Sequence, residues 1–246
     1  MIDPRLAEIE GLRPEPGGIS RSTTMRGTLN GDEVIVKLGG DLAGEWDRLW
    51  WLDGRLPTPH PLQFSPVQPQ LLVQAAMPGI TLDEILHTSS PVDIGRLLGL
   101  AIRMIHDLSI ADCLFRETLD VALARAEAAV ASESVRLDLL DPRLRATPLP
   151  ELLGRLQRER PAVEDLVVTH GEIALANVFT DGSRVSGIVS LGRLGVADRY
   201  RDLAIGVRDL SEDAGPDAVR SFLTTYGLQR PDSHRLNYYA LLDELR

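Results

Sequence analysis

Residues 167–177 read VVTHGEIALAN, and residues 187–200 read GIVSLGRLGVADRY. The first stretch carries an acid, Glu172, directly after a His-Gly pair, and an amide, Asn177, further along. The second stretch carries Ser190 two residues before a glycine. Glycines beside polar side chains indicate loops, so we expect both stretches to contain loops.

Helical patterns surround these stretches. Apolar residues recur at three- and four-residue spacing over 92–108, and an Ala-rich stretch covers 119–131. Further predicted elements are a helix with Leu152, Leu153 and Leu156, β segments near 176–180 and 185–189 around Asp181-Gly182, and helices at about 200–212, 216–226 and 232–244. The larger, later part of the chain is therefore expected to be mainly helical.

The first 77 residues have a different pattern. The predicted elements are a β-hairpin over 16–38, a helix over 41–54, a Pro-rich connection over 57–69 and a short strand over 71–73. Asn30-Gly31 is a strong signal for a two-residue hairpin turn. A Met-Pro-Gly break at 77–79 then separates a small β-rich lobe, 1–77, from a larger helical lobe, 78–246. The expected fold class is α+β.

The composition excludes several classes of protein. Of 246 residues, 43% are hydrophobic and 25% charged, which is typical of a globular chain of one or two domains. The 36 acids against 26 Lys and Arg argue against a nucleic-acid partner and suit a small cationic ligand, although solubility alone also explains an acidic chain.

Targeting and redox signals are absent from the sequence. No apolar run approaches the ~18–20 residues of a membrane helix, and the amino terminus lacks a signal-peptide pattern. A single cysteine, Cys113, allows no internal disulfide. We expect a cytoplasmic protein, monomer or dimer, with no membrane partner.

The two quoted stretches resemble the catalytic loop and the metal loop of aminoglycoside 3′-phosphotransferases, which are relatives of the protein kinases. The resemblance runs from about residue 16 to the end and is strongest over 164–210. It implies a bilobal protein-kinase-like fold, in which 1–77 binds nucleotide and 78–246 carries the catalytic loop and the acceptor site. It also implies ATP or GTP with Mg²⁺, and a small cationic acceptor whose hydroxyl is phosphorylated.

The resemblance assigns nucleotide-binding roles in the first lobe. The residues concerned are Lys37, Glu45, Ser20, Ser22, Ala75 and Met77. Lys37 would contact the phosphates with Glu45 as its partner, the two serines would lie on a loop over the phosphates, and 75–77 would be the hinge that holds the base. That loop has neither a Walker pattern nor G-x-G-x-x-G, so its own signal is weak.

Both acids that the family uses for catalysis are replaced in this chain. Glu172 stands where the family has its catalytic Asp, and Ser190 stands where it has the Asp that binds magnesium. Glutamate can accept a proton, but its extra methylene moves the carboxylate, and a misplacement of ~1 Å can cost ~100-fold in rate. Serine removes a negative charge from the metal site and leaves Asn177 as the remaining ligand. His170 is expected to support the loop.

Acids should line the acceptor site, because aminoglycosides carry several ammonium groups. The positions that match the family's acceptor site are Arg193, Glu212, Asp138, Asp141 and Glu244. Asp138 and Asp141 are expected on a helix over 135–141, and a solvated helix face is the alternative explanation for both.

Three hypotheses follow for function. The first is an ATP-dependent kinase acting on an aminoglycoside or related small molecule, impaired by Glu172 and Ser190. The second is an inactive pseudokinase that serves as a ligand-binding or interaction protein. The third is a kinase for another acceptor, such as a thiosugar or a macrolide.

Overall fold

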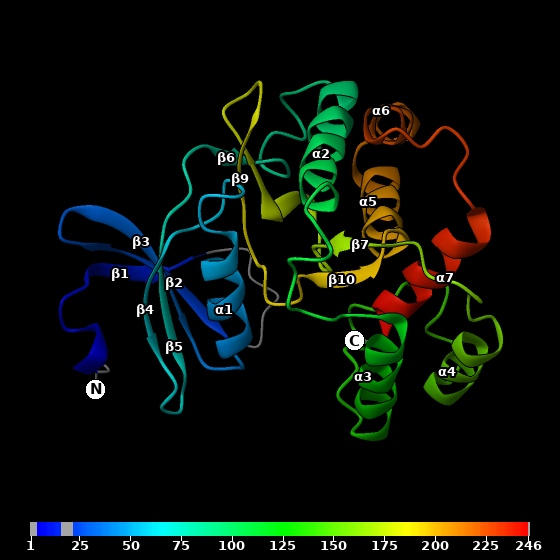
Figure 1. The fold of residues 1–246 in the computed structure, drawn as a ribbon, viewed down its shortest axis with the longest axis horizontal. Helices are drawn as coiled ribbons and strands as arrows, with labels where there is room; N and C mark the ends of the chain where they lie inside the picture. The colour runs from blue at the N-terminus through cyan, green and yellow to red at the C-terminus, as the bar shows by residue number, and fades with distance from the viewer. Residues whose placement is uncertain (1–3, 16–21, 246) are drawn as a thin grey trace. The chain divides into compact units, whose positions relative to one another are not determined.

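The computed structural model describes residues 4–15 and 22–245 (Figure 1). The chain divides into two compact units that are not continuous in sequence. The first unit is Met1–Glu84 with Ala176–Arg193, and the second is Ile85–Leu175 with Leu194–Arg246. Strands dominate the first unit and helices the second, which confirms the predicted α+β class.

An antiparallel five-stranded sheet in the order β1-β2-β3-β5-β4 forms most of the first unit. Its elements are the 3-10 helix Pro4–Leu6, β1 Glu10–Pro14, β2 Thr23–Leu29, β3 Asp32–Leu38, β4 Pro61–Ser65 and β5 Leu71–Ala75, with helix α1 Ala43–Leu52. The β2–β3 turn places Asn30 and Gly31 at φ of 52° and 92°. Both values lie in the left-handed region that a tight hairpin turn requires, which confirms the Asn-Gly prediction.

Alternation along β3 and β5 gives the sheet two different faces. Val34, Val36, Leu71 and Val73 form a buried cluster with Leu6 and Ile9 on one face. The register pairs Lys37 with Leu72 and Ile35 with Gln74, so these four side chains share the opposite face. Lys37 and Gln74 are both buried there.

A second, three-stranded sheet brings a distant segment into the first unit. Its strands are β6 Ile80–Thr81, β8 Val178–Thr180 and β9 Val185–Ile188, in the order β6-β8-β9, and a 3-10 helix, Leu175–Asn177, precedes β8. A side chain on Gly79 would lie 2.3 Å from the carbonyl oxygen of Thr180. Only glycine fits this contact, so Gly79 lets the 77–79 break approach β8.

The second unit consists of helices around a short two-stranded sheet. Its elements are α2 Pro91–His106, α3 Leu119–Ala131, α4 Leu149–Arg158, β7 Leu166–Thr169, β10 Gly195–Asp198, α5 Tyr200–Asp213, α6 Pro216–Tyr226 and α7 Ser233–Glu244. The side chain of Ser90 caps α2 by accepting from the amide of Asp93, and Gly227 ends α6 in the left-handed conformation. None of the helices within 4–15 and 22–245 has both the length and the apolar content that a membrane crossing requires.

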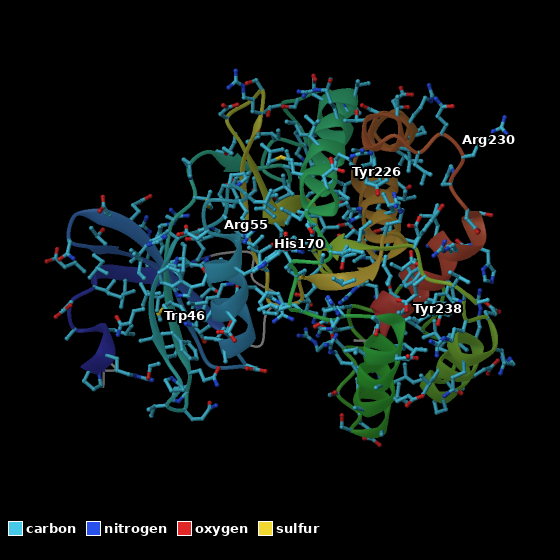
Figure 2. All side chains as sticks on the ribbon, viewed as in Figure 1. Trp46, Arg55, His170, Tyr226, Arg230 and Tyr238 are labelled. Atoms are coloured by element: carbon cyan, nitrogen blue, oxygen red, sulfur yellow. The ribbon has the colours of Figure 1, made fainter. Side chains whose placement is uncertain are left out.

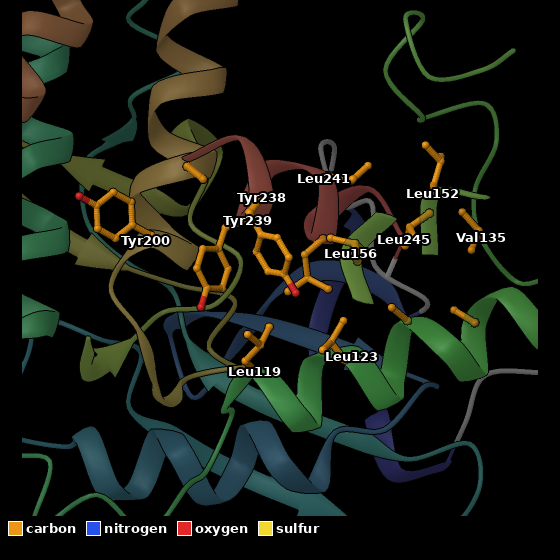
Figure 3. Packing of buried hydrophobic residues seen from close by; sticks show 14 residues of the cluster. Leu119, Leu123, Val135, Leu152, Leu156, Tyr200, Tyr238, Tyr239, Leu241 and Leu245 are labelled. Atoms are coloured by element: carbon orange, nitrogen blue, oxygen red, sulfur yellow. The ribbon is translucent and has the colours of Figure 1, made fainter. Parts of the chain in front are cut away.

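Helices α2 and α6 pack side by side (Figure 1). Gly95 and Gly99 of α2 allow this close approach, because a Cβ on Gly95 would lie 2.0 Å from the carbonyl oxygen of Ala218. A second core joins α3, α4, α5 and α7 (Figure 3). Tyr238 and Tyr239 of α7 lie at its centre, between Leu119 and Leu123 of α3 and Leu156 of α4.

Most predicted elements are confirmed, and several differ. The Pro-rich connection contains β4, because an edge strand tolerates prolines such as Pro61. The predicted helix over 135–141 is wrong, since the chain there makes turns closed by local Arg–Asp pairs. Strands β1, β7 and β10 were not predicted. Residues 16–21 of the expected hairpin lie outside the described residues.

Candidate functional site

Lys37 and Glu45 form a buried ion pair in the first unit. Lys37 is the penultimate residue of β3, and Glu45 lies in the first turn of α1. Nζ of the lysine is 2.6 Å from Oε1 of the glutamate. Both residues are buried. A buried pair fixes the direction of the lysine side chain, so its ammonium is held at one place on this face of the sheet.

The hinge over 75–77 has one amide that the protein does not use. The amide of Ala75 donates to the carbonyl of His60 at 2.9 Å, and that of Ala76 donates to Glu33 at 3.0 Å. Among residues 4–15 and 22–245, the amide of Met77 donates to no backbone carbonyl. Of the three residues of the predicted hinge, Met77 is therefore the one whose amide has no backbone acceptor within the described ranges.

Gln74, immediately before the hinge, carries a buried acceptor without a donor. Its side-chain oxygen has no hydrogen-bond partner among the described residues, and the residue is only 3% exposed. A buried polar group left unpaired destabilises a fold, so such groups require an explanation. Gln74 lies on the same face as Lys37, which makes it a candidate contact for a ligand of that face.

The segment with Asn177 and Ser190 belongs to the first unit as well. The amide of Val189 donates to the carbonyl of Asn177 at 3.0 Å, so β8 and β9 hold these residues close. Ser190 is half-buried with φ of 63°, a left-handed conformation that Asp and Asn adopt more readily than serine. The next turn reaches α1, since a Cβ on Gly192 would lie 3.8 Å from Cβ of Glu45.

These donors fit a magnesium ion poorly. Magnesium prefers carboxylate oxygens, whereas Asn177 and Ser190 offer an amide and a hydroxyl, both neutral. Within the described residues, no group of three or more His, Cys, Asp or Glu side chains could hold a metal. Asn177 and Ser190 therefore bring no negative charge to the segment that the sequence predicted as a metal loop.

In the second unit, Asp202 organises the loop with Glu172. His170, which follows β7 and is labelled in Figure 2, donates its amide to Oδ2 of Asp202 at 2.7 Å. The amide of Gly171 donates to Oδ1 at 2.8 Å, and Nε2 of His106 lies 3.0 Å from Oδ2. Burial opposes the charged form of Asp202, but these hydrogen bonds hold the pKa of its carboxyl below the usual value.

Two consequences follow for the loop residues. The amide of Glu172 donates to Nδ1 of His170 at 3.2 Å, and the His170 side chain is fully buried. His170 thus has a supporting role in this geometry, as the sequence suggested. Glu172 is half-buried.

The second unit also gathers acids from three segments. Glu244, at the end of α7, accepts the amide of Asp141 at 2.8 Å through Oε2. Its other oxygen lies 3.3 Å from Arg208 of α5, whose guanidinium also contacts Asp243 at 2.8 Å and Asp209 at 3.3 Å. Burial raises the pKa of Asp209 to about 6, and burial also raises the pKa of Glu244.

The remaining predicted acceptor residues lie in different surroundings. Glu212 is exposed on α5 and close enough to act electrostatically on Arg143. Asp138 is exposed and bonded to Arg136, which lowers the pKa of its carboxyl to about 2. Arg193 is half-buried in the turn after Ser190 and belongs to the first unit. The structure thus gathers Asp141, Glu212 and Glu244, while Asp138 pairs with its neighbour.

Of the six residues predicted to bind nucleotide, five lie within the described residues. Lys37, Glu45, Ala75 and Met77 all lie in the first unit with the geometry given above. Ser22 is buried at the start of the β2 region. Ser20 lies outside the described residues.

The model of the phosphotransferase enzyme family matches residues 11–239. The chain belongs to this family. It is 37% identical to an aminoglycoside 3′-phosphotransferase of Streptomyces fradiae over 83% of this chain and 79% of that protein. It is 34% identical to a streptomycin 3″-kinase of Streptomyces griseus, again over 83% and 79%.

Solved structures of the phosphotransferase family have the same fold. A crystal structure of a type VIII aminoglycoside 3′-phosphotransferase superimposes with a TM-score of 0.88 at 32% identity, covering 100% of this chain and 96% of that one. An aminoglycoside phosphotransferase from Streptomyces rimosus in complex with ADP and streptomycin gives 0.80 at 29% identity, over 96% and 92%. The family and the kinase-like fold expected from the sequence are confirmed.

The sequence alone did not single out several residues of the candidate site in this family member. Gln74 stands out only because its buried oxygen has no partner in the described structure. Arg208 and Asp209 were visible as an Arg-Asp pair, but their contact with Asp243 and Glu244 depends on how α5 packs on α7. His106 acts through Asp202, which lies 96 positions further along the chain.

Proposed function

We propose that this phosphotransferase-family chain binds a purine nucleotide and transfers its terminal phosphoryl group, at an impaired rate, to a hydroxyl of an aminoglycoside or a related small cationic molecule. The observation that carries the proposal is the buried Lys37–Glu45 pair at 2.6 Å. Maintaining such a pair is useful where the lysine must meet a phosphate, because positioning and charge neutralisation dominate phosphoryl transfer.

The proposed reaction uses residues of this chain in separate roles. Lys37 neutralises charge on the nucleotide phosphates, and the amide of Met77 donates to the base. The Glu172 carboxylate accepts the proton of the acceptor hydroxyl, whose oxygen then attacks the terminal phosphorus as the bond to the nucleoside diphosphate breaks. Asp202 holds the loop that carries Glu172 through the amides of His170 and Gly171.

The family implies magnesium, which would neutralise the phosphates and the leaving diphosphate. The donor set argues that this contribution is weak here, because Ser190 supplies a hydroxyl where a carboxylate is needed. That observation also favours the second candidate, a pseudokinase that binds ligands without transferring phosphate. The proposed reaction therefore uses ATP, depends on magnesium only weakly, and turns over slowly.

Mass-spectrometric detection of phosphorylated kanamycin after long incubation with ATP and magnesium tests the proposal. The natural chain is compared with the double variant Glu172→Asp, Ser190→Asp. We expect slow product formation by the natural chain and faster formation by the double variant. Product from the double variant alone supports the pseudokinase. No product from either, with no ATP binding in calorimetry, contradicts both candidates.

A further inference from the structure

Two local Arg–Asp ion pairs lie in the segment between α3 and α4. Arg136 contacts Asp138 through Nε and Nη2, at 2.9 and 2.6 Å. Arg143 contacts Asp141 in the same two-pronged manner, at 3.0 and 2.6 Å. Each pair is separated by two positions in the sequence, so local geometry explains why both form.

The surroundings of the two pairs differ. The Asp138 and Arg136 side chains are each 61% exposed, and the charges acting on Asp138 are those of Arg136 and Arg145. Asp141 is 17% exposed while its partner Arg143 is 80% exposed. The guanidinium of Arg143 also feels the charges of Glu212 and Glu244. Arg143 is thus a solvent-facing cation next to Glu212 and Glu244, whereas the acid that acts on Arg136 is Asp138.

The acid cluster contains more negative than positive charge. Its carboxylates are those of Asp141, Asp209, Glu212, Asp243 and Glu244. Its cations are Arg143 and the largely buried Arg208, whose contacts to Asp243 and Glu244 fix it in place. Ammonium groups are the ligands that such an excess of carboxylates attracts. Of these two cations, the ones that the cluster holds among residues 4–15 and 22–245, Arg143 is the solvent-exposed one that an incoming ligand would meet.

An ammonium that approaches Asp141 finds both carboxylate oxygens in use. Oδ1 accepts the backbone amide of Arg143 at 2.8 Å and its Nε at 3.0 Å, and Oδ2 accepts Nη2. The guanidinium of Arg143 is 80% exposed, and solvent weakens its attraction to Asp141, so a competing cation can displace it. The guanidinium and the ligand therefore compete for one carboxylate.

We propose that Arg143 is a tethered counter-cation that competes with cationic acceptors for Asp141 and so lowers the affinity and selectivity of the acceptor site for them. This inference rests on the proposed acceptor site and adds a specificity-determining residue to it. It applies to any ligand with several ammonium groups and needs no phosphoryl transfer.

Calorimetric binding tests the proposal on the full chain at low ionic strength. Kanamycin and spermine are titrated into the natural chain, Arg143→Ala and Arg136→Ala. The two variants change the net charge equally and each removes one Arg–Asp pair, so Arg136→Ala controls for the general gain of negative charge. We expect Arg143→Ala to bind both probes about fivefold more tightly, and Arg136→Ala to stay within about twofold of the natural chain.

The outcomes separate this inference from the proposed function. Equal or weaker binding by Arg143→Ala overturns the inference, as does equal tightening in both variants. If neither kanamycin nor spermine binds to any of the three proteins, the inference is overturned as well. If spermine binding tightens in Arg143→Ala while kanamycin binds to none of them, the counter-cation role stands and the aminoglycoside acceptor fails. A circular dichroism spectrum and melting curve for each variant confirm that it is folded.

Discussion

Ser190 adopts a backbone conformation that suits aspartate better than serine. With φ at 63°, Ser190→Asp should leave the free energy of unfolding within about 0.5 kcal/mol, because Asp tolerates the left-handed region. The new carboxylate should make ATP binding magnesium-dependent, with at least about tenfold tighter binding in the presence of the metal. Thermal shift and calorimetry with ATP, with and without magnesium, measure both effects.

Ser190→Asn is the matched control for this change. Asparagine has the shape and backbone tolerance of aspartate without its charge, so it should leave ATP binding indifferent to magnesium. An equal response of both variants would show that side-chain size, rather than charge, governs the metal loop.

The Lys37–Glu45 pair should affect stability and ATP binding in different ways. Lys37→Met leaves a buried carboxylate without a partner and should lower the free energy of unfolding by about 3 kcal/mol. Adding Glu45→Leu should restore most of that loss, since an apolar pair replaces the ions. Urea unfolding measures stability, and ATP-induced stabilisation should stay absent in both variants. Return of the ATP effect in the double variant would contradict phosphate binding by Lys37.

Asp209 should make the stability of the molecule fall as the solution becomes less acidic. Its folded-state pKa of about 6 exceeds the ordinary 3.8, so the folded chain binds this proton more tightly than the unfolded chain. The stabilisation is complete below about pH 4 and lost as the pH rises through 6, by about 3 kcal/mol in total.

Comparison with Asp209→Asn isolates this contribution from that of the other carboxyls. The free energy of unfolding of the variant minus that of the natural chain should increase between pH 4 and pH 7. Urea titrations at several pH values provide the curve. If this difference in unfolding free energy does not change with pH, the pKa of Asp209 lies near its ordinary value, and the description of the acid cluster is weakened.

At the scale of the elements, the close contact of α2 with α6 requires that position 95 carry no side chain. Gly95→Ala would bring Cβ to 2.0 Å from the carbonyl oxygen of Ala218, so the helices must separate. We expect a loss of at least about 2 kcal/mol of unfolding free energy. In α4, Gly154→Ala meets only the flexible end of Arg158, at 3.2 Å, and should stabilise by about 0.5–1 kcal/mol.

Thermal and urea unfolding of the two variants give a direct comparison, because the substitution is identical and both positions lie inside helices. Equal effects would mean that helix propensity outweighs packing at Gly95.

The long helices were predictable because their apolar periodicity extends over three or more turns, as in α2 and α3. Short strands were predictable only where a turn signal marked them. Strands β8 and β9 were predicted because they flank Asp181-Gly182, whereas β7 and β10, with four residues each, have no such signal and are too short to show a period. The prolines of the 57–69 segment hid β4. The helix expected over 135–141 failed because aspartates close to arginines stabilise turns as readily as helices.

At the scale of the whole molecule, the sequence predicted individual residues of the site but not the contacts between residues that are far apart in the chain. Lys37 and Glu45 are only eight positions apart, so a strand and the next helix suffice to bring them together. Asp141 and Glu244 are 103 positions apart, and nothing local predicts their contact. The surroundings of Arg143 follow from that contact, so its effect on the acceptor site could emerge only from the tertiary structure.

The return of Ala176–Arg193 to the first unit has a consequence for synthesis on the ribosome. Strand β6 is made about 100 residues before its partner β8, and at about 5–20 residues per second it waits roughly 5–20 s for that partner. The five-stranded sheet can close during this interval, but the segment after the hinge cannot. A nascent chain paused near residue 170 would therefore expose an unpaired strand edge, and chaperones that recognise such edges should associate with it at that stage.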